Sequence, residues 1–310
     1  MERVVSLIAS ATEIVCALGF EKNLVGRSHE CDFPSYVKKL PVCTQPKLRV
    51  NASSFKVDRQ VKTLLEQGLS VYKVHADKFR KLKPTVIITQ TQCEVCAVSE
   101  SDVKAAVDQW LGANGHAGKK PAVVSLKPNC LADVWKDIKR VAVALGKSRK
   151  GQNVVTRLQK RMKTIKTRAQ RLSERPSVAF IEWIEPLMTG GNWMPELIEM
   201  AGGINLFGQA GRHSPYLKWQ DLVAKNPETI IIAPCGYDIR KTKQEIKALL
   251  RKPEWPGLKA VRANRVYLAD GNQYFNRPGP RLVESLEILA EILHPQEFNF
   301  DHAGKGWQKV

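Results

Sequence analysis

The chain has 310 residues, and 43% of them are hydrophobic, which is enough for two domains of ordinary size, each with its own core. That composition excludes a disordered chain, and no run of about 18 apolar residues is present that could insert into a membrane. The net charge of +19 is compatible with nucleic-acid binding, but no helix-turn-helix, zinc finger or aromatic-basic motif accompanies it, so we predict a solvated basic surface and no nucleic-acid binding.

The first half of the chain has the pattern of an α/β layer. A strand over residues 4–8 is followed by the S-x-x-E sequence of residues 10–13, which predicts a capping box at the start of a helix that ends at Gly19. The helix N-terminus then lies at the carboxyl end of the strand, as in an α/β fold. The other elements predicted here are strands over 24–26, 83–88 and 122–126 and helices over 58–67 and 131–145.

The chain enters its first strand at once, without the long apolar segment and small-residue cleavage site of a signal peptide. We therefore predict a cytoplasmic protein for the chain as written, and a periplasmic or other extracytoplasmic one if the sequence is that of a processed mature form.

Residues 147–173 separate the two halves. This stretch holds ten basic residues and no acidic one. Its apolar residues recur at steps of three and four, the spacing of one helical face. These residues are Val155, Leu158, Met162, Ile165, Ala169 and Leu172. The pattern predicts a helix with one buried stripe, about 30 Å long, that joins two lobes.

The second half repeats the pattern of the first. A strand over 178–181 follows Pro176, and residues 83–88, which lead to Cys93, are echoed by residues 226–232, which lead to Cys235. The remaining predicted elements are helices over 194–200 and from Pro280 to before His294, a strand over 265–268 and a loop over 270–279. We therefore predict an N-terminal α/β lobe over 1–146, an interdomain helix over 147–173 and a C-terminal α/β lobe over 174–310.

In open α/β sheets, ligands bind outside the carboxyl ends of the strands. The loops at those ends are 27–34, 43–47, 89–98, 182–193, 235–238 and 271–279. We expect them to face one another across a cleft, and their aromatic and amide side chains are typical of a site for a large, flat, partly apolar ligand. The alternative is that Trp183 and Trp193 fill the interface between the lobes.

Four stretches, residues 5–19, 24–34, 190–203 and 270–281, resemble the cobalamin-binding branch of the substrate-binding proteins of ABC transporters. This class III periplasmic-binding-protein family, with a helical backbone, also serves iron siderophores and haem. The resemblance extends from residue 4 to about residue 298. It implies two Rossmann-like lobes with central parallel sheets, joined by a single long helix, and a corrinoid held between the lobes by a monomer without catalysis.

The resemblance also implies site residues. The pairs Phe33-Pro34, Glu182-Trp183 and Tyr274-Phe275 are expected to contact the corrin. With the other strand-end residues, the predicted ligand-binding set is Phe33, Pro34, Glu182, Trp183, Asn192, Trp193, Tyr237, Tyr274, Phe275 and Arg277. Family members dock on an ABC permease through one glutamate on each lobe. Here those places are held by Asp77 and Gln220, so we predict Asp77 as the docking residue.

The seven cysteines are odd in number and irregular in spacing, which favours free thiols over a disulfide framework. Several lie near the strand-end loops, and two of them form a C-x-x-C. A soft metal ion held by thiols and an imidazole is therefore one hypothesis, with thiol redox chemistry and buried apolar cysteines as alternatives. The predicted ligands of this metal are His29, Cys31, Cys93, Cys96 and Cys235. His29 or a cysteine is also a candidate axial ligand of a corrinoid cobalt.

The sequence has no P-loop, dinucleotide fingerprint, H-E-x-x-H or G-x-S-x-G motif, and His213, His294 and His302 are interpreted as surface histidines. We predict a non-enzymatic protein that binds cobalamin or a related corrinoid as the solute-binding component of an ABC importer. The alternatives are a metal-chelate or haem-binding protein, and a cytoplasmic thiol-dependent metal-binding or redox protein.

Overall fold

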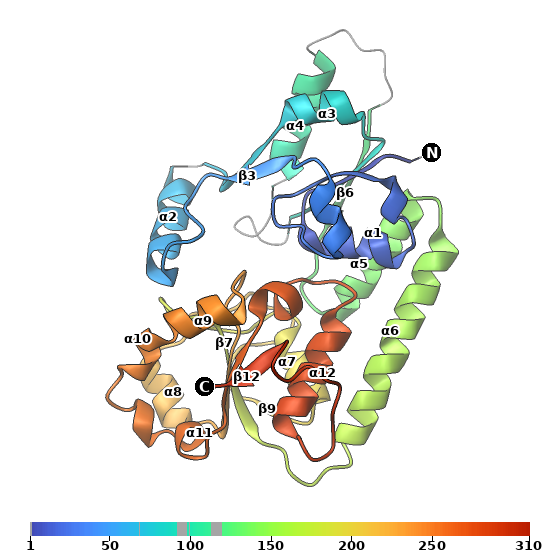
Figure 1. The fold of residues 1–310 in the computed structure, drawn as a ribbon. Helices are drawn as coiled ribbons and strands as arrows, with labels where there is room; N and C mark the ends of the chain where they lie inside the picture. Colours follow the sequence, from blue (N-terminus) through green and yellow to red (C-terminus); the bar gives the residue numbers. More distant parts are fainter. Residues whose placement is uncertain (1, 68, 92–97, 99, 113–119) are drawn as a thin grey trace. The chain divides into compact units, whose positions relative to one another are not determined.

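The computed structural model describes residues 2–67, 69–91, 98, 100–112 and 120–310 (Figure 1). The chain divides into two compact units. Unit 1 comprises residues 1–52, 59–128 and 132–157, and unit 2 comprises residues 53–58, 129–131 and 158–310. Each unit contains a mainly parallel sheet with helices, which confirms the predicted two-lobed α/β fold.

Unit 1 is built on a parallel sheet whose two central strands are continuous runs of buried residues. Such runs form where both faces of a parallel sheet are covered. In spatial order the strands are β2 (Leu24–Arg27), β1 (Val4–Ser6), β5 (Val86–Gln90) and β6 (Ala122–Leu126). Val4 pairs with Val86, and Ile88 pairs with Val124, so β5 is paired on both sides.

Helices cover this sheet, and one of its faces forms a defined core. Ile87 and Val5 pack there with Phe79 and Trp110, whose rings meet edge to face at 6.5 Å. The helical elements of unit 1 are α1 (Ala9–Ala17), η1 (Glu21–Asn23), η2 (Ser35–Lys39), α3 (Ala76–Leu82), α4 (Glu100–Gly112) and α5 (Leu131–Ala144), with α2 (Ser54–Glu66) and α6 (Ser148–Ala169) shared with unit 2. A separate antiparallel pair is formed by β3 (Thr44–Pro46) and β4 (Tyr72–Val74).

The start of α1 differs from the prediction. The helix begins at Ala9, its N-cap residue is Ile8, and no side chain caps it, so the predicted capping box is wrong. The backbone N–H of Thr12 already donates to the carbonyl of Ile8, which places Ser10 within the first turn, where it is fully buried. The predicted end at Gly19 is confirmed by a φ of +74°, a conformation that glycine adopts without strain.

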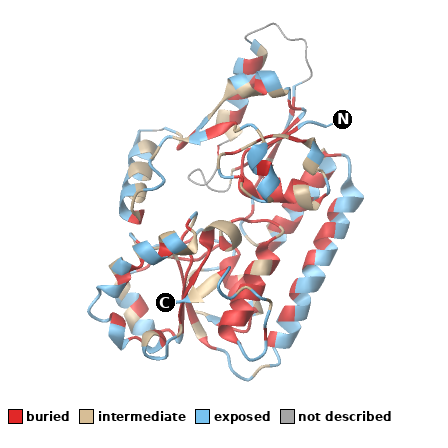
Figure 2. Cartoon of the chain, viewed as in Figure 1, coloured by how far each residue is buried: buried red, intermediate tan, exposed pale blue. Residues whose placement is uncertain are grey.

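The basic stretch between the two halves forms α6, one helix of 22 residues that runs from unit 1 into unit 2. Its predicted stripe, from Val155 through Leu158 and Met162 to Ile165 and Ala169, is buried. Figure 2 shows this red stripe and the pale blue, exposed side of the helix. The helix ends at Ala169, before the predicted boundary, and its division between the units falls after residue 157.

Unit 2 is built on a mixed sheet. Its strands in spatial order are β12 (Trp307–Lys309), β11 (Val266–Ala269), β10 (Thr229–Ile232), β7 (Ser177–Trp183) and β8 (Met188–Thr189), and β9 (Ile204–Asn205) also pairs with β7. The three inner strands are parallel, with Ile231 opposite Phe180 on one side and Tyr267 on the other. The strands β8 and β12 are antiparallel to their neighbours.

Helices pack on both faces of the unit 2 sheet. On one face Ile181, Ile230 and Leu268 pack with Leu222 and Trp255, and on the other Phe180 packs with Phe275 at a ring distance of 5.3 Å. The helical elements are α7 (Met194–Met200), α8 (Trp219–Lys225), α9 (Ile239–Glu245), α10 (Lys247–Leu250), η3 (Trp255–Gly257), α11 (Lys259–Arg262), η4 (Gly271–Phe275) and α12 (Leu282–Leu293). The predicted loop over 270–279 therefore contains one turn of π-helix, η4.

The internal repeat seen in the sequence is a repeat of local structure. The helices α3 and α8 are each seven residues long, and each ends in a left-handed residue, Lys83 with φ +43° and Asn226 with φ +44°. Each of these residues is followed by a proline and then by an inner strand of its sheet, β5 or β10. The two units therefore deliver an inner strand by the same turn.

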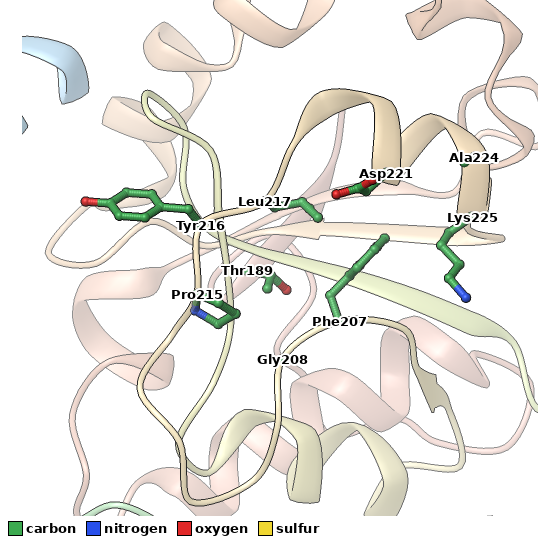
Figure 3. A pocket seen from close by; sticks show the side chains of 9 residues that line it. All are labelled: Thr189, Phe207, Gly208, Pro215, Tyr216, Leu217, Asp221, Ala224 and Lys225. Carbon is green, nitrogen blue, oxygen red and sulfur yellow. The ribbon is translucent and has the colours of Figure 1, made fainter.

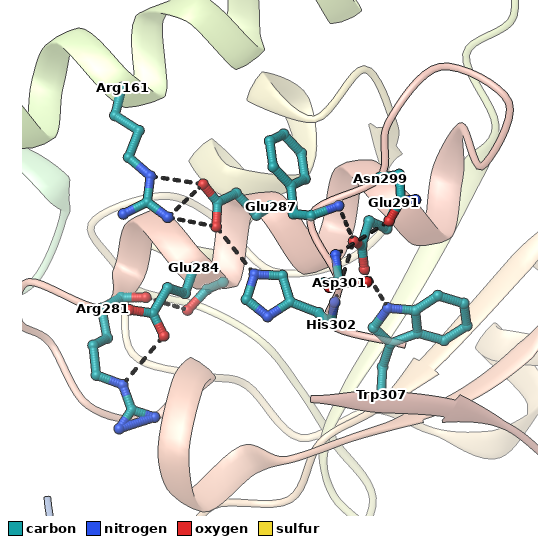
Figure 4. A network of polar contacts seen from close by, with 11 residues as sticks. Arg161, Arg281, Glu284, Glu287, Glu291, Asn299, Asp301, His302 and Trp307 are labelled. Carbon is teal, nitrogen blue, oxygen red and sulfur yellow. Dashed lines mark hydrogen bonds and ion pairs between the residues drawn. The ribbon is translucent and has the colours of Figure 1, made fainter. Parts of the chain in front are cut away.

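Two carboxylates of α12 hold the C-terminal segment (Figure 4). Glu291 accepts hydrogen bonds from the indole of Trp307 at 2.7 Å and from the backbone of Phe300. Glu287 receives a bidentate contact from Arg161 of α6 at 2.7 Å and lies 3.0 Å from Nε2 of His302. The prediction that His302 and His294 are surface residues is wrong, because His302 lies in this network and His294 is buried.

Candidate functional site

The carboxyl ends of the inner strands of unit 2 are held together by close backbone contacts. A Cβ atom at Gly271, directly after β11, would lie 2.2 Å from the carbonyl oxygen of Pro234, which follows β10. Only glycine allows this approach. The backbone N–H of Asn272 then donates to the carbonyl of Tyr237 at 3.0 Å. The loops after β10 and β11 therefore form one surface beside the end of β7.

Two aromatic rings meet at this surface. The rings of Trp183, at the end of β7, and Tyr237 lie 5.2 Å apart at 48°. The indole N–H of Trp183 donates to the carbonyl of Glu185 at 3.0 Å, which fixes a ring that is only partly buried. Burial raises the pKa of Tyr237, and its hydroxyl has no hydrogen-bond partner within the described residues. Trp183 supplies the accessible surface of the pair, and Tyr237 is 6% exposed, with its neutral hydroxyl buried.

Glu182 is fixed by its neighbours. Its carboxylate accepts a hydrogen bond from the Ser214 hydroxyl at 2.9 Å, and that hydroxyl accepts one from the backbone N–H of Gly191 at 3.0 Å. The next residue, Asn192, has a φ of +51°, and its N–H donates to the carbonyl of Arg212 at 2.6 Å. Glu182 and Asn192 are thus parts of one hydrogen-bonded corner at the end of β7.

Polar side chains of the η4 loop form hydrogen bonds with one another. The buried guanidinium of Arg277 donates to the side-chain oxygen of Asn272 at 2.9 Å. Asp270 accepts hydrogen bonds from the backbone of Gln273 at 2.8 Å and from its side chain at 3.2 Å, and burial raises the pKa of this carboxyl group. Tyr274 is half-buried, with the Arg281 guanidinium 4.7 Å from its ring. These hydrogen bonds link the residues of the loop, and its charged groups Asp270, Arg277 and Arg281 are buried.

Two residues of the predicted ligand-binding set belong to the core of unit 2. Trp193 is buried, and its indole N–H donates to the carbonyl of Phe275 at 3.0 Å. Phe275 is completely buried against Phe180. Both side chains serve the packing of α7 and η4 on the sheet, so the proposed contact set below omits them.

In unit 1, the predicted residues Phe33 and Pro34 follow β2. They are joined by a cis peptide bond, and Phe33 is 41% exposed. Nearby, Nδ1 of His29 lies 2.8 Å from the hydroxyl of Thr44. Burial, with a smaller contribution from Arg27, lowers the pKa of His29 to about 4, so the 3.8 Å contact with the Glu30 carboxylate involves a neutral imidazole.

The predicted metal ligands are not brought together within the described residues, which contain no group of three metal-binding side chains. Cys31 is buried and accepts a hydrogen bond from the Thr12 hydroxyl at 3.0 Å, and Cys235 lies in unit 2. Cys93 and Cys96 lie outside the described residues. The thiol–metal hypothesis stays a prediction that depends on these two cysteines.

The predicted docking residue Asp77 is exposed in the first turn of α3. Gln220 is exposed at the matching place in α8, and the next residue, Asp221, supplies a carboxylate in that first turn. Both helices thus carry an exposed carboxylate within their first three residues.

A pocket of about 380 Å³ lies in unit 2 beside α8 (Figure 3). Phe207, Pro215 and Leu217 give it an apolar lining, and Asp221 and Lys225 contribute charged groups. None of the ten predicted ligand-binding residues lines it. Sequence reasoning missed this pocket because its residues come from a strand, a loop and a helix that share no motif.

Comparison with known proteins identifies the family of this chain. The family model described as "Periplasmic binding protein" matches residues 4–272. The chain belongs to this family. Members are non-catalytic solute-binding proteins, which confirms the prediction that the chain is not an enzyme.

Individual relatives are distant but cover nearly the whole chain. The uncharacterized ABC transporter substrate-binding lipoprotein YvrC of Bacillus subtilis is 26% identical over 96% of this chain and 81% of its own length. The vitamin B12-binding protein of Photorhabdus laumondii is 23% identical, over 94% of this chain and 88% of its own.

Solved structures with the same fold have similarly low sequence identity to this chain. The periplasmic heme-binding protein RhuT of Roseiflexus sp. RS-1 has a TM-score of 0.68 at 21% identity and covers 95% of this chain and 98% of its own. The periplasmic vitamin B12-binding protein BtuF of Vibrio cholerae has a TM-score of 0.64 at 19% identity and covers 94% of this chain and 96% of its own.

These findings correct the predicted location. The expectation of a cytoplasmic protein is wrong, because the family is one of periplasmic binding proteins and its relatives include an extracytoplasmic lipoprotein. Within the described part of the chain, no helix combines the length and the apolar character needed to cross a bilayer.

Proposed function

We propose that the protein is an extracytoplasmic solute-binding component of an ABC importer and that its ligand is cobalamin or a related corrinoid. The aromatic pair of Trp183 and Tyr237 at the strand ends of unit 2 carries this proposal. Aromatic rings held beside fixed polar groups suit a large, flat, partly apolar ligand. Tyr274 of unit 2 and the Phe33-Pro34 loop of unit 1 complete the proposed contact set.

The polar groups around the rings support a corrinoid. The rim of a corrinoid carries amides, which need neutral donors and acceptors, and a hydroxyl and an amide are present at Tyr237 and Asn272. The Arg277 guanidinium is already directed at the Asn272 side chain. Curated relatives named as vitamin B12-binding proteins match over most of the chain, which adds support.

Haem is the second candidate. Its support is the likeness to several structures of heme-binding proteins, all at low identity. Haem has two carboxylates, so cations are the groups it would need at the site. Lys241, whose Nζ lies 5.5 Å from the Tyr237 ring, is the cation placed for that role, although it already pairs with Glu245 at 3.1 Å.

Ligand retention separates these candidates. The purified protein is mixed with cyanocobalamin or with hemin, desalted and examined by absorbance, and affinities are then measured by calorimetry. We expect stoichiometric retention of the corrinoid and at least tenfold weaker binding by Trp183→Ala. The matched control is Tyr216→Ala, an exposed aromatic residue of unit 2 outside the proposed set, which should bind normally. Retention of hemin alone would establish the second candidate, and retention of neither would overturn the proposal.

The proposed importer requires a permease, and Asp77 is the proposed contact in unit 1. We expect Asp77→Lys to retain full ligand affinity and to lower uptake at least tenfold when the permease is present, because the substitution reverses an exposed charge. Lys73→Glu, a charge reversal at an exposed residue of β4, is the control. Equal uptake by all three proteins would exclude Asp77 as the docking residue.

A further inference from the structure

The exposed side of α6 has an unusual charge distribution. Residues 138–173 contain no aspartate or glutamate, and α6 alone carries eight of the basic residues in this span. The apolar stripe of the helix is buried, so its polar side forms part of the surface (Figure 2). The exposed cations that share this side of the helix are Arg149, Arg157, Lys160 and Lys163, which we call the α6 cationic strip. Between the first and the last of them the helix rises about 21 Å.

Other cations of α6 make contacts within the protein, whereas those of the α6 cationic strip do not form ion pairs with described residues. Arg161 and Arg168, on the flank of the helix, pair with Glu287 and Glu297 of unit 2 at 2.6 and 3.3 Å. Lys150 lies 5.0 Å from the ring of Phe20 in unit 1. By contrast, no residue of the α6 cationic strip makes an ion pair with a described residue. Water and salt screen the repulsion among these exposed charges, and an external anionic surface would lower it further.

The geometry favours an extended anionic surface over a nucleic acid. The strip lies along the exposed side of a single helix, and α6 contains no aromatic residue on which a base could stack. Grooved, aromatic-lined surfaces are typical of single-strand binding, and a helix in a major groove reads bases with side chains at its N-terminal end. A flat surface of negative charge can contact a row of cations on one helix without a groove or stacking aromatic side chains.

We infer that the α6 cationic strip is a docking surface for a bilayer that contains anionic phospholipid. Each lysine or arginine close to such a surface strengthens binding by about fivefold, and the attraction extends over about one Debye length. The inference is independent of which ligand the protein takes.

Vesicle sedimentation tests this inference with the full chain. Vesicles of phosphatidylcholine with about one-third phosphatidylglycerol are compared with pure phosphatidylcholine in about 0.1 M NaCl, where the Debye length is about 10 Å. We expect binding to the anionic vesicles only. The variant Arg157→Ala/Lys160→Ala/Lys163→Ala should bind about 100-fold more weakly, as expected from three cations at about fivefold each. Alanine has the highest helix propensity, so thermal unfolding by circular dichroism should be unchanged.

The matched control removes the same charge elsewhere. Lys218, Lys243 and Lys247 are exposed lysines of unit 2 outside α6, and their triple alanine variant should lose less than threefold. Equal losses in the two triple variants would show that net charge alone is responsible, and that result overturns the inference. Failure of the wild-type protein to bind the anionic vesicles overturns it as well, as does binding to a short DNA duplex that the vesicles cannot displace.

Discussion

The strand ends of the two units share a backbone design and differ in their side chains. In each unit an inner parallel strand follows a seven-residue helix, a left-handed residue and a proline. In unit 1, the strand ends carry the buried hydroxyls of Ser6, Thr12 and Thr44, and Thr44 lies 2.8 Å from the neutral imidazole of His29. In unit 2 the corresponding edge carries the Trp183 and Tyr237 rings. The repeated backbone turn thus determines which strand ends can form a site. The side chains there are mainly polar in unit 1 and aromatic in unit 2.

Two tryptophans of unit 2 have different roles, since Trp193 packs in the core and Trp183 is a proposed ligand contact. The largest predicted loss of stability tests this difference. Trp193→Ala should lower the free energy of unfolding by about 4 kcal/mol, because it removes a buried indole and leaves the Phe275 carbonyl without its donor. Trp183→Ala should cost about 1 kcal/mol, since its ring is only partly buried. Urea denaturation measures both. Similar losses would contradict the separation between a core tryptophan and a ligand-binding one.

The buried carboxylates of unit 2 hold a segment in place. Glu291→Ala should cost about 3 kcal/mol, because it leaves the Trp307 indole and two backbone N–H groups of the C-terminal segment without their acceptor. The control, Glu297→Ala, removes one exposed pair with Arg168 and should cost less than about 1 kcal/mol. Chemical denaturation and proteolysis of the C-terminal segment check this prediction. A stable, protease-resistant Glu291→Ala protein would contradict it.

The buried carboxylate of unit 1 behaves differently, because burial raises the pKa of Asp137 from 3.8 to about 6. Folding therefore favours its protonated form, and the resulting stabilisation is complete below about pH 4 and is lost as the pH rises through 6. We expect Asp137→Asn to abolish a loss of about 2 kcal/mol between pH 4 and pH 7. Thermal unfolding across this range gives the measurement, with the more exposed Asp133→Asn as the control. The same pH slope in wild type and Asp137→Asn would refute the assignment.

The smallest effect concerns the Tyr237 hydroxyl. Because it is buried without a hydrogen-bond partner among the described residues, Tyr237→Phe should leave the free protein unchanged or more stable by up to about 1 kcal/mol. Ligand affinity should fall by about fivefold to tenfold, since the hydroxyl is the proposed donor to the ligand. Calorimetry and urea denaturation together show whether stability and affinity move in opposite directions. A fall in both stability and affinity would show that the hydroxyl stabilises the fold.

The sequence predicted the inner strands and the helices α2, α5, α6, α7 and α12 because their patterns are local, but the 13-residue helix α4 was not predicted. The helix α6 and its stripe from Val155 to Ala169 follow from spacing alone. The seven-residue helices α3 and α8 were not predicted, although α7, which has the same length, was. The strand β12 forms by pairing with β11. The capping-box prediction failed because the burial of Ser10 overrides a local capping preference.

The candidate site was predicted less completely, because strand ends can be located from sequence but side-chain directions cannot. Trp183 and Trp193 are ten residues apart in the same loop region, and only the structure shows that one is fixed near the surface and the other packs on Phe275. Likewise, His302 has no sequence signal that it contacts Glu287 of α12. Such contacts depend on tertiary packing, which no motif encodes.

The contact at Gly271 has a consequence for how ligand preference can change. The carbonyl oxygens of Ala233 and Pro234 leave room there only for a hydrogen atom, so no side chain fits between the two loops, and the hydrogen bond from Asn272 to the carbonyl of Tyr237 links them. A substitution that repositions Tyr237 will also displace Asn272 and the turn behind it. A new ligand specificity in this chain therefore requires coordinated substitutions in both loops.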